Sequence, residues 1–229
     1  MLHKTKGIVI NFIKYKESSI ITKIYTEKFG LQTYIENGVR SSKGKNKIAL
    51  FQPLTLLDLV VYHDHKKEIH RISEIKCSTS FRSIPYELKK SCSALFLNEV
   101  LNKSLKESSE NEALFGFLTD AILYLDSHDH QIENFHLYFL LNYCFYLGFA
   151  PENGKEIFDQ FFSFSYQIPH DLETINFIDQ IIHKDFGDAL LLTRIQRNQV
   201  LDVILAFYRL HVEDFGELRS LAVLKEILG

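Results

Sequence analysis

The stretch Gly7-Ile-Val-Ile-Asn-Phe-Ile13 sets the character of the first part of the chain, and Ser19-Ile-Ile-Thr-Lys-Ile-Tyr25 follows it after a polar turn. Both are rich in β-branched and aromatic residues, which favour strands. Three further strands are expected at Leu31–Ile35, Leu54–Tyr62 and Ile69–Cys77. Short strands with no helix between them favour a small closed barrel, because the edges of an open sheet would need cover.

From Ile84 onward the apolar residues recur at helical spacing, which predicts an all-α part. Residues 134–147 are apolar nearly all round and should form its central, buried helix, which ends at Gly148. Residues 152–170 are expected to be irregular. Other helices are expected at residues 84–105, 114–125, 172–183, 190–212 and 219–228. The fold class is therefore α+β, with a barrel domain over residues 1–80 and a helical domain over residues 81–229.

The charge is divided between these two parts. Residues 1–90 hold 17 Lys and Arg against 8 Asp and Glu, whereas residues 91–229 hold 9 against 21. The net charge of −3 conceals this division. A basic barrel joined to an acidic helical part indicates that the barrel meets a polyanion and that the helical part provides scaffold and protein contacts.

The loop Arg40–Lys47 holds four of the cations, namely Arg40, Lys43, Lys45 and Lys47. On a small barrel such a loop can contact phosphates, with the lysines as point charges and the arginine as a forked donor. The alternative is a solvated turn. Lys6 and Lys23 extend the candidate contact surface along the strands, and Tyr25, Tyr34 and Tyr62 could stack on bases or else be half-buried strand residues.

No metal or cofactor is expected. Cys77, Cys92 and Cys144 are widely spaced and form no zinc or disulfide framework. The histidine pairs around Asp64 and Asp129 are interpreted as solvated loop residues, because they have no further ligands at suitable spacing. The chain has no phosphate-binding, zinc-protease or nucleophile-elbow motif, so an enzyme is not expected. No stretch is long and apolar enough for a membrane span.

Arg194 and Arg197 stand at i and i+3 of an expected helix, in a part of the chain that is poor in cations. Exposed beside Leu191, Ile195 and Val200, they could hold an acidic peptide with an apolar tip. The alternative is an ordinary surface ion pair with local carboxylates.

Five segments, in order along nearly the whole chain, resemble the family of bacterial recombination mediators known as DNA repair protein RecO. They are Thr5-Lys-Gly-Ile-Val-Ile10, Tyr25-Thr-Glu-Lys-Phe-Gly30, Asn37-Gly-Val-Arg40, Phe135–Pro151 and Phe215-Gly-Glu-Leu-Arg-Ser-Leu221. The resemblance implies an N-terminal OB-fold, a helical C-terminal domain and no enzyme activity in the usual sense. It also implies a bacterial cytoplasmic protein associated with the nucleoid.

The family resemblance further implies binding of single- and double-stranded DNA and annealing of complementary strands. It implies work with RecR to load RecA on DNA coated with single-stranded DNA-binding protein (SSB), whose acidic tail Arg194 and Arg197 would hold. Many members carry a zinc-binding cysteine cluster after the central helix, but Glu152–Phe164 contains no cysteine.

Two other functions fit the charge division. An RNA-binding or translation-associated OB protein would show the same basic barrel, and backbone charge alone does not distinguish RNA from DNA. A structural adaptor would use the basic face to meet an acidic protein instead.

Overall fold

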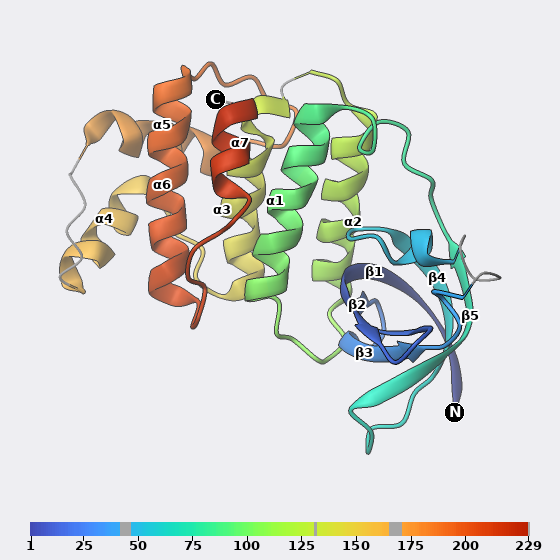
Figure 1. Ribbon diagram of the computed structural model, residues 1–229. Coiled ribbons are helices and arrows are strands. Elements are labelled where there is room, and N and C mark those ends of the chain that lie inside the picture. Colours follow the sequence, from blue (N-terminus) through green and yellow to red (C-terminus); the bar gives the residue numbers. More distant parts are fainter. Residues whose placement is uncertain (42–46, 131, 165–170, 229) are drawn as a thin grey trace. The chain divides into compact units, whose positions relative to one another are not determined.

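The computed structural model describes residues 1–41, 47–130, 132–164 and 171–228, which form a strand-rich and a helical part (Figure 1). The strands are β1 (Leu2–Tyr15), β2 (Ser19–Thr26), β3 (Gly30–Glu36), β4 (Leu56–Tyr62) and β5 (Ile69–Cys77). The described helices are α1 (Leu88–Ser104), α2 (Glu112–Ser127), α3 (Phe135–Leu147), α4 (Gly154–Ser163), α5 (Leu172–Ile182), α6 (Arg194–His211) and α7 (Leu221–Ile227).

The five strands close into a barrel in the order β1-β2-β3-β5-β4. Strand β3 runs parallel to β5, and the other neighbouring pairs are antiparallel. Alternate side chains point inward, and a core cluster is made by Val9, Ile24, Tyr34, Leu57, Leu59 and Val61. The expected closed barrel is confirmed, with the arrangement of an OB-fold.

Strand β1 is long enough to pair with two neighbours. Its first half pairs with β4 from Leu2 to Ile8, and most of its length pairs with β2. The register with β2 shifts between Val9 and Asn11. An irregularity of this kind bends a strand, which lets β1 pass from one side of the barrel to the other and close it.

The barrel belongs to a compact unit that also takes in residues 100–123, while residues 83–99 and 124–229 form the second unit. The Leu31 amide donates to the Glu107 carbonyl over 2.8 Å, so the chain after α1 pairs with the start of β3. The Tyr25 ring stacks on Phe115 of α2 with ring centroids 6.2 Å apart. The barrel is therefore completed by residues that the sequence assigned to the helical domain.

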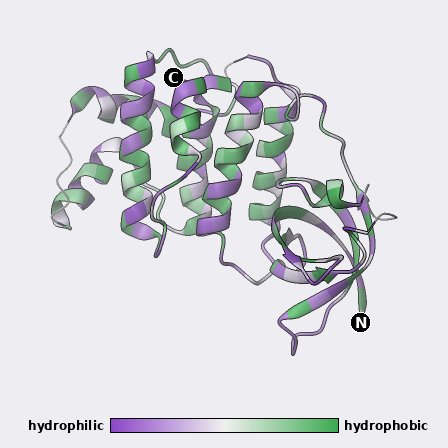
Figure 2. Ribbon diagram, viewed as in Figure 1, coloured by the Kyte–Doolittle hydropathy of each residue, from purple (hydrophilic) through white to green (hydrophobic). Residues whose placement is uncertain are grey.

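In the second unit α3 is the buried helix, as expected, and Figure 2 shows hydrophobic residues recurring along the helices. The Tyr208 hydroxyl of α6 donates to the Leu140 carbonyl of α3 over 2.7 Å. The Glu99 carboxylate accepts from the amides of Arg219 and Ser220, both over 2.8 Å, which fixes the start of α7. Among the described residues no helix combines the length and the apolar character that a membrane span requires.

Residues 152–163 differ from the expectation of irregular structure, because α4 occupies most of them. Asn153 caps this helix by accepting from the Glu156 amide over 3.0 Å, and Ile157, Phe158 and Phe161 are buried on one side. The stretch has no Cys or His, and the Glu156 carboxylate accepts from Glu152 and Gln160. The family's zinc module does not fit these residues.

Candidate nucleic-acid interface

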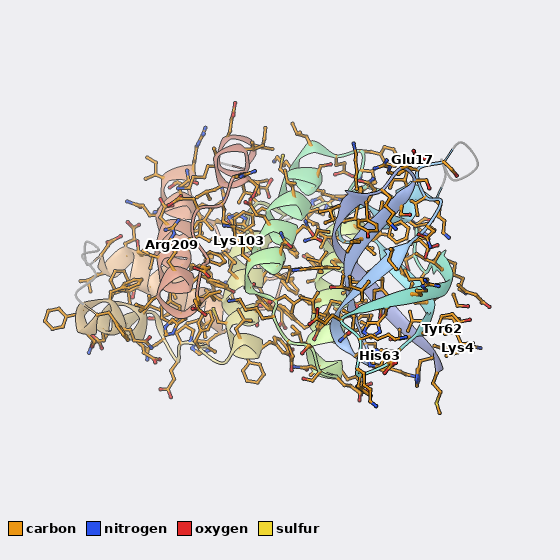
Figure 3. The ribbon with its side chains drawn as sticks, turned by 60° about the horizontal axis from the view of Figure 1, so that its bottom comes forward. Lys4, Glu17, Tyr62, His63, Lys103 and Arg209 are labelled. Atoms are coloured by element: carbon orange, nitrogen blue, oxygen red, sulfur yellow. The ribbon has the colours of Figure 1, made fainter. Side chains whose placement is uncertain are left out.

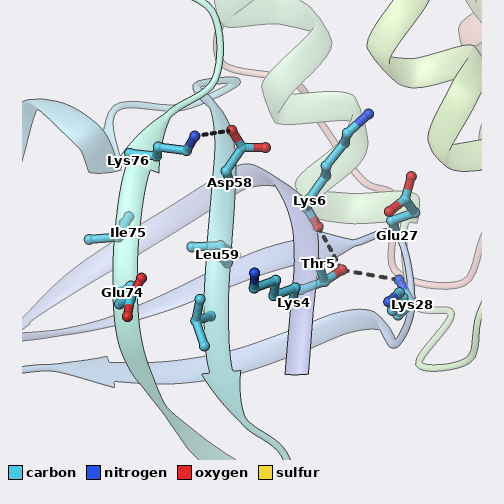
Figure 4. Close-up of a pocket in the computed structure, with 11 residues that line it drawn as sticks. Lys4, Thr5, Lys6, Glu27, Lys28, Asp58, Leu59, Glu74, Ile75 and Lys76 are labelled. Atoms are coloured by element: carbon cyan, nitrogen blue, oxygen red, sulfur yellow. Dashed lines mark hydrogen bonds and ion pairs between the residues drawn. The ribbon is translucent and has the colours of Figure 1, made fainter. Parts of the chain in front are cut away.

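A groove of about 520 Å³ crosses the outer face of β1, β4 and β5 (Figure 4). Lys4 and Lys6 face outward on β1, because Thr5 between them and Gly7 after them are buried. The strand register places Lys6 beside Asp58 and Asp58 beside Lys76. The groove's cations therefore come from two strands, β1 and β5, and from Lys28 in the β2–β3 turn, while β4 contributes Asp58.

Three ammonium groups in this groove are available to a ligand. Lys76 forms an ion pair with Asp58 over 3.3 Å. Lys4, Lys6 and Lys28 make no ion pair within the described part of the chain, and all three are exposed. Glu27, Asp58 and Glu74 also line the groove. The positive charge is thus concentrated where β1 meets the β2–β3 turn and does not fill the groove.

A second group of cations lies at the other end of β1 and at the start of the β1–β2 turn. Lys14 and Lys16 are exposed there on either side of Tyr15, and the Lys16 ammonium lies 5.3 Å from the centre of that ring. Figure 3 shows Lys4 and Glu17 near opposite ends of the barrel. Two cationic regions therefore border the barrel.

The described cations of the basic loop are already engaged. The Arg40 guanidinium donates to the carbonyls of Lys16 and Glu17, so it ties the loop to the β1–β2 turn. Lys47 forms an ion pair with the nearly buried Glu36 over 2.5 Å. Lys43 and Lys45 lie outside the described residues. These contacts leave Arg40 and Lys47 with fewer free hydrogen-bond donors for a phosphate.

Lys23 is exposed in the middle of β2, paired in register with Asn11 and Thr33, and it joins neither cationic region. The interpretation of Tyr25 and Tyr34 as residues that stack on bases is wrong, because both rings are fully buried. Burial also raises the pKa of both hydroxyls. Tyr62 is 51% exposed and can present its ring.

The expectation that Arg194 and Arg197 are both exposed is wrong for Arg197. Its guanidinium is buried and donates to Asn134 Oδ1 over 2.9 Å and to the carbonyls of Leu228 and Leu192 over 2.6 and 3.2 Å. Arg194 is exposed beside Leu191 and Ile195, which are 95% and 71% exposed. Only Arg194 of this pair is open to a partner.

The histidines of the two His-Asp-His segments differ in their exposure to solvent. His128 and His130 are exposed, as expected. The interpretation of His63 as a solvated residue is wrong, because it is 8% exposed and packs between other rings. Within the described ranges no group of three or more His, Cys, Asp or Glu residues could hold a metal ion.

The closed five-stranded barrel and the helices that follow it define an OB-fold protein with a helical C-terminal part. Residues 1–81 match the family described as Recombination protein O N terminal, and residues 85–222 match Recombination protein O C terminal.

Curated relatives agree along the whole chain. The DNA repair protein RecO of Flavobacterium psychrophilum is 38% identical over 99% of both chains, and that of Christiangramia forsetii is 38% identical over 100% of both. The RecO protein of Bacteroides fragilis is 35% identical over 99% of both chains. The chain belongs to the RecO family of DNA repair proteins.

Proposed function

We propose that this protein binds single- and double-stranded DNA through its barrel and anneals complementary strands without catalysing a chemical reaction. The observation that carries the proposal is the group of exposed ammonium groups of Lys4, Lys6 and Lys28, which form no ion pair with another described residue, on an OB-fold barrel in a DNA repair family. A barrel of this type commonly binds nucleic acid across one face and the adjoining loops.

The chemistry of lysine determines the kind of recognition. An ammonium group is a flexible point charge, and its contacts with phosphate carry no sequence information. Binding should therefore be independent of sequence, and much of its free energy should come from counterion release. Annealing follows because a surface that neutralises phosphates reduces the repulsion between two strands held near it.

The mediator role concerns the helical unit and its partners. We propose that the protein works with RecR to load RecA on DNA coated with SSB, and that it acts on the nucleoid in the bacterial cytoplasm. Arg194, with Leu191 and Ile195 exposed beside it, suits the acidic, apolar-ended tail of SSB. One donor of Arg194 is used by the Lys225 carbonyl over 3.2 Å, and the guanidinium has further donors.

The decisive experiment is annealing of two complementary fluorescent oligonucleotides at a stated salt concentration. The protein should accelerate duplex formation, and raising the salt should suppress the acceleration. A parallel measurement of affinity for single-stranded DNA and RNA tests the RNA-binding alternative. A protein that leaves the annealing rate unchanged and binds neither nucleic acid at low salt would disprove the proposal.

We expect the triple change Lys4→Gln, Lys6→Gln and Lys28→Gln to weaken binding to all DNA sequences alike. The slope of log K against log salt should flatten by about two to three units, since each lost phosphate contact removes about 0.7–0.9. The matched variant neutralises Lys43, Lys45 and Lys47. If the loop triple flattens the slope and the groove triple does not, the main contact lies on the basic loop.

We expect Arg194→Glu to weaken the binding of an SSB tail peptide by about tenfold, because one charge-assisted hydrogen bond contributes about 1.5 kcal/mol. Lys155→Glu makes the same charge reversal at an exposed site on α4 and should change the affinity by less than about twofold. Fluorescence anisotropy measures both. Equal effects of the two variants would remove Arg194 from the partner surface.

A further inference from the structure

Four histidines from separate segments meet at one end of the barrel. His3 comes from β1, His63 and His65 from the β4–β5 loop, and His70 from β5. We call these four residues the histidine cluster. Figure 3 shows His63 near Lys4 at this end of the barrel. The annealing proposal makes no use of the cluster.

The rings of the cluster are packed and partly unsatisfied. His63 lies between Phe29 and His70, with ring centroids 4.0 and 4.6 Å away and planes inclined by 12° and 28°. His63 and His70 are 8% and 4% exposed, and neither buried Nδ1 has a hydrogen-bond partner among the described residues. His63 Nε2 lies 3.4 Å from Nδ1 of the exposed His65. A proton placed between these two nitrogens would connect the buried rings to the surface.

A hollow of about 700 Å³ opens beside these rings. Its lining combines the rings of the half-buried Phe29 and the exposed His65 with the ammonium groups of Lys28 and Lys67. Lys67 also forms an exposed ion pair with Asp64 over 3.8 Å. Aromatic faces next to cations are the chemistry that holds a nucleotide of a single strand, with the base on a ring and the phosphate on a charge. Lys28 also lines the groove across β1, β4 and β5, so the two hollows share a border.

We propose that the β4–β5 loop and the histidine cluster form a second contact for the phosphates of a DNA strand, and that an imidazole of the cluster takes up a proton when the strand binds. This inference rests on the proposed DNA binding. It adds a second DNA contact to the proposed function, and it links the protonation of a histidine to the binding of the strand.

The surroundings of the cluster determine whether its imidazoles are protonated before DNA binds. Burial lowers the pKa of His63, and the neighbouring imidazoles of His70, His65 and His3 lower it further, against an opposing effect of Asp64. Burial also lowers the pKa of His70, where Asp64 acts in the opposite direction. These rings are therefore neutral near neutral pH in the free protein.

A bound phosphate adds further negative charge beside the cluster. It raises the imidazole pKa, so the complex holds a proton that the free protein does not. DNA affinity should accordingly rise as the pH falls. The other charged or titratable groups at this site are the Met1 amine, Lys28, Tyr34, Tyr62, Lys67, Glu68, Arg71 and Glu110. The two carboxylates among them oppose the phosphate.

The test uses the full chain and a single-stranded oligothymidine at constant salt. Anisotropy should show affinity rising by about fivefold or more from about pH 8 to about pH 6, where histidine titrates. Calorimetry in two buffers of different ionisation enthalpy should show proton uptake at neutral pH. In His65→Gln, which keeps a polar side chain that cannot take the proton, both the uptake and the pH response should fall by at least about half.

The control is His130→Gln, an exposed loop histidine in the helical unit, which should behave as the unchanged protein does. His63→Gln should lose the response more fully, and if it does not fold, His65→Gln decides the result. Binding with no proton uptake, or with the same uptake in His65→Gln, would overturn this inference and leave the DNA-binding proposal intact. If the protein does not bind the oligonucleotide at any pH, the proposed DNA-binding function itself is disproved.

Discussion

Gly30→Ala should destabilise the protein by about 3–5 kcal/mol, measured as the free energy of unfolding in urea. Gly30 begins β3 with φ of +63°, a conformation that costs an L-residue about 1–2 kcal/mol. A Cβ at this position would also collide with the Ser109 carbonyl oxygen and lie 2.7 Å from that of Glu107. Both atoms are backbone, so the chain after α1 would have to leave the strand.

Gly38→Ala is the matched control, because Gly38 has φ of +72° and no atom of the described residues lies within 4 Å of the added Cβ. Its cost should be that of the backbone conformation alone, about 1–2 kcal/mol. The difference between the two variants measures how firmly residues 107–109 are held against the barrel. Equal destabilisation would mean that this segment yields easily.

This segment also shows why the strands could be predicted and the contact between the barrel and the chain after α1 could not. Alternation of apolar and polar residues is a local signal, and β5 lies where it was expected, from Ile69 to Cys77. The bond from the Leu31 amide to the Glu107 carbonyl joins residues far apart in sequence through the backbone. Side-chain identities contain no record of such a bond.

The candidate site was predicted only in part for the same reason. Lys6 was identified from the charge of the barrel half, but its grouping with Lys4 and Lys28 depends on the register of β1 with β4 and on the β2–β3 turn. The burial of His63 depends on loop closure against Phe29. Strand pairing and loop closure are tertiary properties, so a cation-rich sequence indicates the kind of partner better than the place of contact.

Two misinterpretations left usable signals in the sequence. Asn153 followed by Glu156 is a helix start, and Ile157 and Phe161 at i and i+4 give one apolar side, which together indicate α4. Arg197 lies three positions before Val200 and seven before Ile204, both fully buried. It therefore falls on the buried stripe of α6, although it is only three positions from the exposed Arg194.

Arg197→Ala should destabilise the helical unit by about 3–5 kcal/mol, because each buried acceptor left without its donor costs about 1–3 kcal/mol. The guanidinium donates to the Asn134 side chain before α3, to the Leu192 carbonyl before α6 and to the Leu228 carbonyl after α7. One side chain thus joins three helix ends, and water can replace it only where the site opens to solvent. A loss of this size is a large share of the roughly 5–15 kcal/mol that usually separates the folded from the unfolded state.

Arg194→Ala is the control for Arg197→Ala, since it removes the same side chain one turn earlier on the exposed side of α6 and should cost less than about 0.5 kcal/mol. Urea unfolding followed by circular dichroism measures both variants. The affinity of each variant for the SSB tail peptide is then measured by fluorescence anisotropy at a temperature where both variants are folded. Arg197→Ala should then bind the peptide with nearly unchanged affinity, and Arg194→Ala should bind it more weakly. The reverse pattern, a stable Arg197→Ala protein with lost peptide binding, would make the buried arginine a partner contact and contradict its structural role.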